Sequence, residues 1–314
     1  MSGKCIRGLD ALDAAVRGCA LSIGNFDGVH LGHQRLIETG RRHALVCGAA
    51  MVAMTFEPPP DQVLRPDDVI KRIVPVELKA RLLLDAGCDL VVLVTADREL
   101  LSMTPQQFID EIVVARFAPS HVVEGPDFSY GRKRSGTIDT LREAAAAGGF
   151  EVHVVEPLQL ELDGQEHRIS SSLIRLLVER GRVGEARRCL GKDFALCGEV
   201  VRGAGRGGQL LGFPTVNLHS PQQVCPADGV YAGWAELDGT RSVAAISIGS
   251  NPTLHPASGR SVEAHLLDVR GDFYGRRMTL EFVDRLRDQR KFESIDALQE
   301  QIAKDIEHVR RIVE

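Results

Sequence analysis

The sequence predicts an α/β doubly wound parallel-sheet domain, followed by a small antiparallel β-barrel domain with a C-terminal helix. Up to about residue 190, short apolar runs alternate with helical stretches, which is typical of a parallel sheet between helices. From residue 191, strand-like segments follow one another, which is typical of a small barrel. The chain of 314 residues is also about twice as long as a typical domain. We therefore expect two domains, 1–190 and 191–314.

The first domain is expected to contain short strands that are continuously apolar. Strands of this kind are covered on both faces of the sheet, and ligands bind beyond their carboxyl ends. In chain order we expect a strand at Ala20–Gly24, a helix at His33–Ala44, a strand at Ala50–Phe56, a helix at Pro75–Ala86, a strand at Leu90–Val94, a helix at Pro105–Arg116, a strand at His121–Glu124, a helix at Ile138–Ala147, a strand at Glu151–Val155, and a last helix that opens near Arg168.

The second domain is expected to consist of strands with few helical stretches between them. The expected strands are Ala195–Val201, Val230–Leu237, Ser242–Ile248, Val262–Val269 and Met278–Val283. A helix from Ser294 to about Val313 closes the chain, with Ser294 as its N-cap. Its apolar residues recur at helical spacing, so one face of this helix should pack on the barrel.

Composition and charge exclude several classes of protein. The balance of 38 Lys+Arg against 43 Asp+Glu gives a net charge of −5, which disfavours a general nucleic-acid-binding protein. No apolar stretch is long enough to span a bilayer, and residues 1–10 lack the apolar core of a signal peptide. The seven cysteines are scattered and form no CxxC pair, so we expect neither a disulfide framework nor a zinc site. These observations predict a cytoplasmic protein without nucleic-acid or membrane partners.

A glycine-rich turn follows the first strand and leads into a helix. The turn reads Gly24-Asn25-Phe26-Asp27-Gly28-Val29-His30-Leu31-Gly32-His33. Free backbone N–H groups and the helix dipole favour phosphate at such a helix start. His30 and His33 can also donate hydrogen bonds to phosphate oxygens as charge develops during transfer. The alternative is two histidines in an ordinary loop, and the preceding strand and GNFDG favour a nucleotide site.

A second phosphate-binding segment is predicted at 168–175, which reads RISSSLIR. Hydroxyl side chains at the start of a helix are often plain caps. Arg168 and Arg175 flank them, and a guanidinium group pairs with phosphate through two hydrogen bonds. From these residues alone, a capped helix and a triphosphate clamp both stay open.

The run at 202–217, RGAGRGGQLLGFPTVN, is the densest segment of the second half. Its glycines, among them Gly205, Gly207 and Gly212, free the backbone to curl its N–H groups around phosphates. Thr215 and Asn217 lie on one face of an extended segment, and oxygen ligands of this kind suit Mg²⁺. Composition alone favours the alternative, a glycine-rich hairpin in a barrel.

Several segments together resemble the bifunctional riboflavin kinase/FAD synthetase family of bacteria, whose N-terminal module belongs to the HxGH nucleotidyltransferases. In chain order they are GNFDGVHLGHQRLI, TFEPPP, VVEGPDFSYGRKRSG, RISSSLIR, GFPTVN and VEAHLLD. The resemblance covers nearly the whole chain, and it turns the balance at 202–217 toward a phosphate site. It implies a nucleotidyltransferase-like FMN adenylyltransferase (FAD synthetase) domain at 1–190 and a riboflavin kinase domain at 191–314.

The resemblance also implies roles for individual residues. His30, His33 and Arg168 would be catalytic residues of adenylyl transfer. Glu263, which from sequence alone could be a solvated strand residue, would be the base for riboflavin phosphorylation. Thr215 and Asn217 would be metal ligands. The nucleotide- and phosphate-binding residues would be Gly24, Asn25, Phe26, Asp27, Gly28, Asp127, Ser171, Ser172, Arg175, Gly205, Gly207, Gly212 and Pro214.

The predicted function is the conversion of riboflavin to FMN and of FMN to FAD, each with one ATP and with Mg²⁺, the second step releasing pyrophosphate. We expect riboflavin, FMN, FAD and ATP as partners, and a monomer or weak homo-oligomer. One alternative is a riboflavin kinase with an impaired adenylyltransferase half. Another is an HxGH nucleotidyltransferase for a different substrate with a non-catalytic barrel, and a third is a non-enzymatic flavin-binding protein.

The sequence departs from the family pattern after the second strand. The family usually has F-x-P-H-P where this chain has Phe56-Glu57-Pro58-Pro59-Pro60. Pro59 therefore replaces a polar imidazole with a ring that has no N–H donor. We expect slower adenylylation or weaker FMN binding as a result. Ser172 stands where the family usually has threonine, and this change keeps the hydroxyl group.

Overall fold

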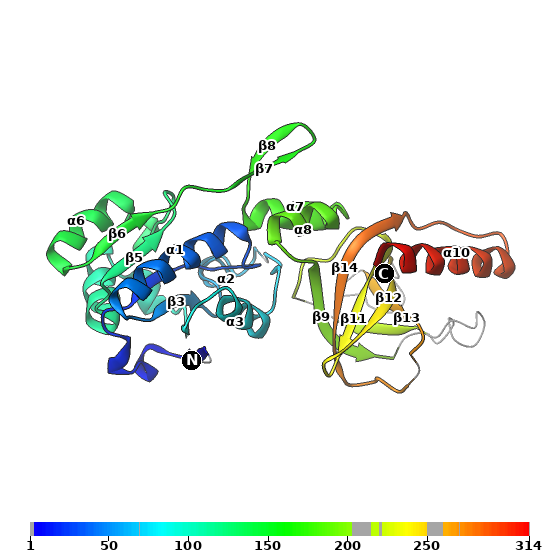
Figure 1. Ribbon diagram of the computed structural model, residues 1–314, viewed down its shortest axis with the longest axis horizontal. Coiled ribbons are helices and arrows are strands. Elements are labelled where there is room, and N and C mark those ends of the chain that lie inside the picture. The colour runs from blue at the N-terminus through cyan, green and yellow to red at the C-terminus, as the bar shows by residue number, and fades with distance from the viewer. Residues whose placement is uncertain are drawn as a thin grey trace. The chain divides into compact units, whose positions relative to one another are not determined.

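The computed structural model describes residues 3–68, 70–202, 215–219, 222–249, 260–269 and 271–313 (Figure 1). The chain forms two compact units. The first consists of Met1–Ile70 and Val76–Ile169, and the second of Lys71–Pro75 and Ser170–Glu314. The second unit thus includes a five-residue segment from the first half of the sequence.

The first unit is built on a six-stranded parallel sheet. The strand order is β1-β4-β3-β2-β5-β6, and every neighbouring pair is parallel. Because the chain adds β3 and β4 on one side of β2 and then returns to place β5 on its other side, the topological switch point lies between β2 and β5. The strands are β1 (Lys4–Arg7), β2 (Ala20–Ile23), β3 (Met51–Phe56), β4 (Leu90–Val94), β5 (His121–Glu124) and β6 (Glu151–Val154).

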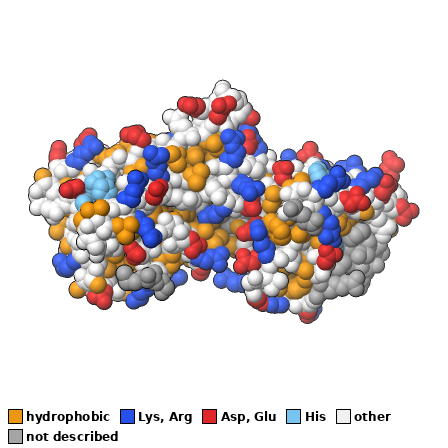
Figure 2. Space-filling view, in the orientation of Figure 1, with side chains coloured by type: hydrophobic (Ala, Val, Ile, Leu, Met, Phe, Trp, Pro, Cys, Tyr) orange, Lys and Arg blue, Asp and Glu red, His pale blue; other side chains and the backbone are white. Residues whose placement is uncertain are grey.

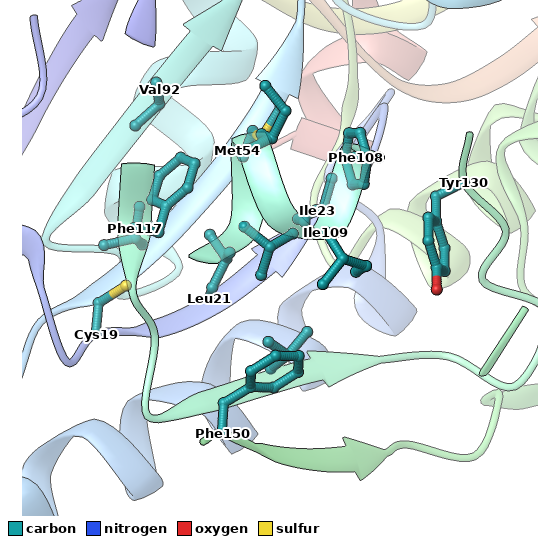
Figure 3. Packing of buried hydrophobic residues seen from close by; sticks show 14 of the residues in the cluster. Cys19, Leu21, Ile23, Met54, Val92, Phe108, Ile109, Phe117, Tyr130 and Phe150 are labelled. Atoms are coloured by element: carbon teal, nitrogen blue, oxygen red, sulfur yellow. The ribbon is translucent and has the colours of Figure 1, made fainter. Parts of the chain in front are cut away.

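Helices pack on both faces of this sheet, because alternate residues of its apolar strands point to opposite sides. On one face, Ala20, Met51 and Val91 pack with Ile37 and Leu83 from two helices. On the other face, Leu21, Ile23 and Met54 pack with Phe108, Ile109 and Phe117 (Figure 3). The helical segments are α1 (Leu31–Cys47), α2 (Pro60–Leu64), α3 (Val76–Asp85), α4 (Arg98–Ser102), α5 (Pro105–Gln107), the π-helix η3 (Phe108–Phe117), α6 (Ile138–Gly148) and the short 3₁₀ turns η1 (Leu9–Ala11), η2 (Ala14–Val16) and η4 (Arg132–Arg134).

A two-stranded antiparallel hairpin ends the first unit. It is formed by β7 (Gln159–Leu162) and β8 (Gln165–Arg168). Its turn at Asp163 and Gly164 has φ of 52° and 75°. The left-handed conformation of both residues is the one that a tight two-residue hairpin requires.

The second unit is a closed antiparallel barrel. In the sequence, two helices precede its strands and one helix follows them. The strand order is β10-β13-β12-β11-β14-β9. Its interior includes the rings of Phe194, Tyr231 and Phe282, and the Tyr231 and Phe282 centroids lie 5.4 Å apart in an edge-on arrangement. The elements are α7 (Ser171–Glu179), α8 (Val183–Leu190), β9 (Phe194–Val201), β10 (Val216–His219), β11 (Gly229–Leu237), β12 (Thr240–Gly249), β13 (Ser261–Leu266), β14 (Arg277–Arg287) and α10 (Ile295–Val313).

Helix α10 packs on the barrel as its spacing predicts. Val309 is fully buried against Ala232 and Leu267. The buried Asp305 carboxylate accepts hydrogen bonds from Arg287 of β14, with Nη2 to Oδ2 at 2.7 Å. Ser294 caps the helix, since its Oγ accepts from the N–H of Ala297 at 3.1 Å.

The fold class predicted from the sequence is confirmed, and the differences are local. The helix expected at Pro105–Arg116 is α-helical only over Pro105–Gln107 and continues as a π-helix to Phe117. The strand expected at Val262–Val269 ends at Leu266, and Asp268 has a left-handed φ of 60°. The predicted domain boundary between residues 190 and 191 stays a prediction.

Candidate functional site

The glycine-rich turn lies at the switch point of the parallel sheet, between Ile23 at the end of β2 and Leu31 at the start of α1. Two of its non-glycine residues have left-handed backbone conformations, Phe26 with φ of 47° and Val29 with φ of 44°. A β-branched residue such as Val29 rarely adopts this conformation, because its Cβ branches crowd the backbone. Strain of this kind concentrates at functional sites.

His30 and His33 form one stacked pair at the start of α1. Their ring centroids are 3.5 Å apart with an interplanar angle of 19°, and the edge of Phe26 packs on His33 at 5.2 Å. His30 is the N-cap, because its Nδ1 accepts a hydrogen bond from the His33 N–H at 3.3 Å. An Nδ1 that accepts must be unprotonated, so the neutral His30 ring carries its proton on Nε2.

Burial keeps both imidazoles neutral. Desolvation and, to a smaller extent, the positive charge of Arg168 lower the pKa of His30 to about 4, although a backbone hydrogen bond acts in the opposite direction. Desolvation also lowers the pKa of His33 well below its usual value, with smaller contributions from His30 and Lys79. The Nδ1 atom of His33 is buried and has no hydrogen-bond partner among the described residues. The site can therefore present neutral N–H donors to an anionic ligand.

Glu124 is a site residue that sequence reasoning missed. It ends β5, is only 3% exposed, and its Oε1 accepts from the Ile23 N–H at 2.6 Å. β2 and β5 pair only through Ala20–His121 and Leu21–Val122, so this carboxyl group replaces the next backbone acceptor. Burial raises the pKa of Glu124 well above its usual value. Glu124 thus holds the end of β2 from which the histidine turn starts.

Lys79 of α3 is the second residue that sequence reasoning missed. Its side chain is buried, 5% exposed, beneath the turn. The Nζ atom donates to Thr55 Oγ1 at 3.0 Å, to the Phe56 carbonyl at 3.1 Å and to the Asn25 carbonyl at 3.3 Å. Hydrogen bonds from a buried ammonium group are strong because they are charge-assisted. Lys79 therefore ties the turn to the carboxyl end of β3.

The structure places the other predicted residues of this half on two separate segments. Asp127, on the loop after β5, forms an ion pair with Arg168 at the end of β8. Ser170 caps α7, since its Oγ accepts from the Leu173 N–H at 3.2 Å. Ser171 and Ser172 are the first two residues of that helix. Arg175, one turn later, donates from Nε to the Lys71 carbonyl at 2.9 Å.

The barrel brings Glu263 and Asn217 together through strand register. Asn217 of β10 is directly opposite Glu263 of β13, and Ser247 of β12 is opposite Glu263 on its other side. Residues directly opposite in antiparallel strands point to the same face and lie close enough to interact. Neighbouring Val262 and Ala264 are buried, so this row faces the outside of the barrel.

The electrostatics of this row suit a proton acceptor. Partial burial raises the pKa of Glu263 above its usual value, by desolvation alone. Ser247 Oγ accepts a hydrogen bond from Gln289 Nε2 at 2.8 Å, which fixes one neighbour of the carboxylate. Within the described part of the chain, no hydrogen bond to the Glu263 carboxylate is present. A carboxylate in this state is able to accept a proton from a bound hydroxyl group.

The two halves of the chain match two family models. Residues 12–173 match the model described as FAD synthetase, and residues 190–313 match the model described as riboflavin kinase. Curated relatives match along nearly the entire chain. The bifunctional riboflavin kinase/FMN adenylyltransferase of Pseudomonas fluorescens is 34% identical and covers 98% of this chain and 97% of its own. The chain belongs to the bifunctional riboflavin kinase/FMN adenylyltransferase family.

Other relatives agree with this family. The enzymes of the same name from Escherichia coli K12 and Bacillus subtilis 168 are each 35% identical, over 96% and 91% of this chain and 95% and 89% of their own. A crystal structure described as a macrolide-efflux protein from Streptococcus pneumoniae aligns over 99% of both chains with a TM-score of 0.86 and 29% identity. That name differs from those of the curated relatives, and the likeness in fold extends over both units. Of the helices that the structure describes, none is long and apolar enough to cross a membrane.

Part of the family's predicted kinase site lies outside the described residues. This applies to Gly205, Gly207, Gly212 and Pro214. Thr215 is described directly before β10, and both Thr215 and Asn217 are partly exposed.

Proposed function

We propose that this chain converts riboflavin to FMN in its barrel and FMN to FAD on its parallel sheet, using one ATP in each step. The first step transfers the γ-phosphoryl group and releases ADP, and the second joins FMN to AMP and releases pyrophosphate. The observation that carries this proposal is that both halves match their family models and each holds its own set of polar residues. We assign 1–190 to adenylyl transfer and 191–314 to riboflavin phosphorylation.

In the adenylylation step, the FMN phosphate attacks the α-phosphorus of ATP directly. His30 would donate from Nε2, because its Nδ1 is held as an acceptor by the His33 N–H. Donors fixed before the reaction stabilise the charge that develops on the phosphoryl oxygens. The backbone of Gly24–Gly28 would approach the nucleotide, with Asn25, Phe26 and Asp27 lining the turn. Asp127, Arg168, Ser171, Ser172 and Arg175 would bind nucleotide and phosphates.

In the kinase step, Glu263 would accept the proton of the terminal ribityl hydroxyl as that oxygen attacks the γ-phosphorus. Its raised pKa supports this role, because it makes the carboxylate a stronger base than an exposed one. Gly205, Gly207, Gly212 and Pro214 would surround the nucleotide phosphates.

The barrel residues fit a magnesium ion bound with ATP. Asn217, opposite Glu263 in the strand register, supplies an amide oxygen, and Thr215, two residues earlier in the chain, supplies a hydroxyl oxygen. Mg²⁺ prefers oxygen ligands and shares phosphate oxygens of the substrate. When bound, the ion would neutralise triphosphate charge, and Thr215 and Asn217 would orient it. We also propose a cytoplasmic location, no nucleic-acid or membrane partner, and a monomer or weak homo-oligomer.

One incubation tests this function against the alternatives. The full chain is mixed with riboflavin, ATP and Mg²⁺, and the flavins are separated by chromatography. We expect FMN to appear first and FAD to follow. FMN without FAD would instead support a riboflavin kinase with an impaired adenylyltransferase half. A parallel incubation contains FMN in place of riboflavin. If neither flavin is converted, both assigned activities are refuted, and the remaining alternatives are a nucleotidyltransferase for a different substrate and a non-enzymatic flavin-binding protein.

A further inference from the structure

A second group of histidines lies at the opposite end of the parallel sheet from His30 and His33. It consists of His43 in α1, His121 at the start of β5 and His153 in β6. Each of them offers a ring nitrogen, and these three nitrogens all lie within 4.8 Å of one another. Figure 2 shows histidine side chains gathered, in pale blue, on the surface of the first unit. We propose that these three histidines bind a divalent transition-metal ion, for which zinc is the best match.

The rings already stand close to the arrangement that a metal needs. His121 Nδ1 and His153 Nε2 are 3.1 Å apart, and the His43 and His153 rings stack with centroids at 3.7 Å. With Zn–N bonds of about 2.0–2.1 Å, ligand nitrogens in a tetrahedral site are about 3.3 Å apart. The nitrogens of His121 and His153 already have nearly this spacing, and the stacked His43 and His153 rings would turn so that all three nitrogens face one ion. The His121 and His153 side chains are 12% and 22% exposed, so an ion can enter from solvent while most of each side chain stays buried.

The groups around the histidines also favour a cation. Cys47 Sγ lies 3.4 Å from His121 Nε2, one helical turn after His43 on the same face of α1. When Nδ1 of His121 ligates, Nε2–H can donate to this sulfur, and metal-bound histidines usually have such a partner on the other nitrogen. Glu151 Oε2 lies 3.7 Å from both His121 Nδ1 and His153 Nε2. Its carboxylate would offset the charge of the ion or complete its coordination.

The position of the cluster in the fold adds one more favourable interaction and indicates its role. Helix α1 ends at Cys47, and a helix C-terminus attracts positive charge. A bound ion would connect the last turns of α1 to His121 at the start of β5 and to His153 within β6. The first turn of the same helix carries His30 and His33. Imidazole ligands select zinc-like ions over Mg²⁺, so this site is distinct from the magnesium that accompanies ATP.

Titration with cobalt tests the proposal without any flavin or nucleotide. The full chain is freed of metal with a chelator, dialysed, and titrated with Co²⁺, whose visible absorption reports nitrogen coordination. We expect one Co²⁺ per chain and its displacement by one equivalent of Zn²⁺. His153→Ala should weaken binding at least 100-fold, whereas His308→Ala, an exposed histidine of α10, should bind like the wild type.

Thermal unfolding supplies a second measurement that does not depend on one variant. Zn²⁺ should raise the Tm of the wild type and of His308→Ala, because a ligand that binds only the folded state stabilises it. It should not raise the Tm of His43→Gln, a polar replacement at a partly buried position of α1. No stoichiometric cobalt binding by the wild type would overturn the proposal. Unchanged binding by both His43→Gln and His153→Ala would overturn it as well.

Discussion

The histidine turn of the first unit and the glutamate row of the barrel (Asn217, Ser247 and Glu263) both contain a buried or partly buried ionisable side chain. The side chain is a base in the first site and an acid in the second. Burial lowers the pKa of His30 to about 4, and burial raises the pKa of Glu263. Desolvation disfavours the charged form in both cases. Each site therefore shifts its ionisable group toward the neutral form, one as a hydrogen-bond donor and the other as a stronger base.

The two sites differ in how they are assembled. His30 and His33 are three residues apart and meet because a helix starts between them. Asn217 and Glu263 are far apart in sequence and meet only through the register of β10 and β13. The turn is held by hydrogen bonds from the buried Lys79 side chain. The positions of Asn217 and Glu263 are set by the strand pairing of the barrel itself.

The largest effect is expected from Lys79→Met, which removes the cation beneath the histidine turn. Three acceptors on Asn25, Thr55 and Phe56 would lose a buried charged donor. We expect the free energy of unfolding of the first unit to fall by about 3 kcal/mol, measured by urea denaturation. FAD formation should fall with it, while FMN formation by the barrel stays. Lys4→Met, at an exposed position, is the matched control. Equal stability of the two variants would show that the turn supports itself.

The second prediction concerns acid. The pKa of His30 in the folded chain is about 4, against 6.5 in an unfolded chain, so the unfolded state binds a proton first as the pH falls. The contribution of neutral His30 to the free energy of unfolding is fully present above pH 6.5. It is lost as the pH falls through 4, and for this pKa shift it amounts to about 3 kcal/mol. His30→Asn keeps an N-cap acceptor without titrating in this range. Urea unfolding at pH 7 and pH 4.5 should show a smaller loss in this variant. The same loss in both proteins would contradict the burial of His30.

The third prediction concerns Glu263, for which stability changes with pH in the opposite direction. Because its pKa is raised in the folded chain, the unfolded state loses its proton first as the pH rises above 4.5. The destabilisation by Glu263 therefore grows as the pH rises from 4.5 to the pKa of Glu263 in the folded chain, and it stays constant above that pH. Glu263→Gln should make the barrel more stable at pH 7 relative to pH 4, compared with the wild type. Unfolding followed by Trp234 fluorescence in the barrel would measure this difference. A variant that is less stable at pH 7 would contradict the assigned cause of the shift.

The smallest effect is expected from Pro59→His. Pro59 is the N-cap of α2 and provides no side-chain hydrogen bond there. Restoring the imidazole of the family pattern should raise the rate of FMN adenylylation or lower the KM for FMN several-fold, and leave riboflavin phosphorylation unchanged. Steady-state kinetics of FAD formation from FMN measures both constants. Identical constants would show that the departure is harmless.

Sequence patterns predicted the buried strands well because burial on both faces leaves a run of apolar residues. β4 was expected at Leu90–Val94 and has those bounds. β1 was missed because its four residues are mostly exposed and mixed in polarity. The β7–β8 hairpin was missed for the same reason, since its short strands are mainly polar. The π-helix at Phe108–Phe117 depends on packing, and its amino-acid composition fits an ordinary helix.

The candidate sites divide in a similar way. His30, His33 and Glu263 lie in contiguous motifs that a reader of the sequence can find. Lys79 and Glu124 carry no local signal, because a lysine on a helix and a glutamate at the end of a strand are usually exposed. The cluster of His43, His121 and His153 has no spacing pattern at all, since the sheet brings three separate segments together. A search of the sequence for metal sites by cysteine spacing could not reveal it.

We propose that two separate sites carry the two steps. The most direct test measures both reactions in His33→Ala and Glu263→Gln, each checked for folding by circular dichroism. His33→Ala should lower FAD formation from FMN by about 10²–10³-fold, as expected for a lost transition-state donor, and spare FMN formation. Glu263→Gln should suppress FMN formation and spare FAD formation from added FMN. Loss of both reactions in either well-folded variant would contradict the assignment.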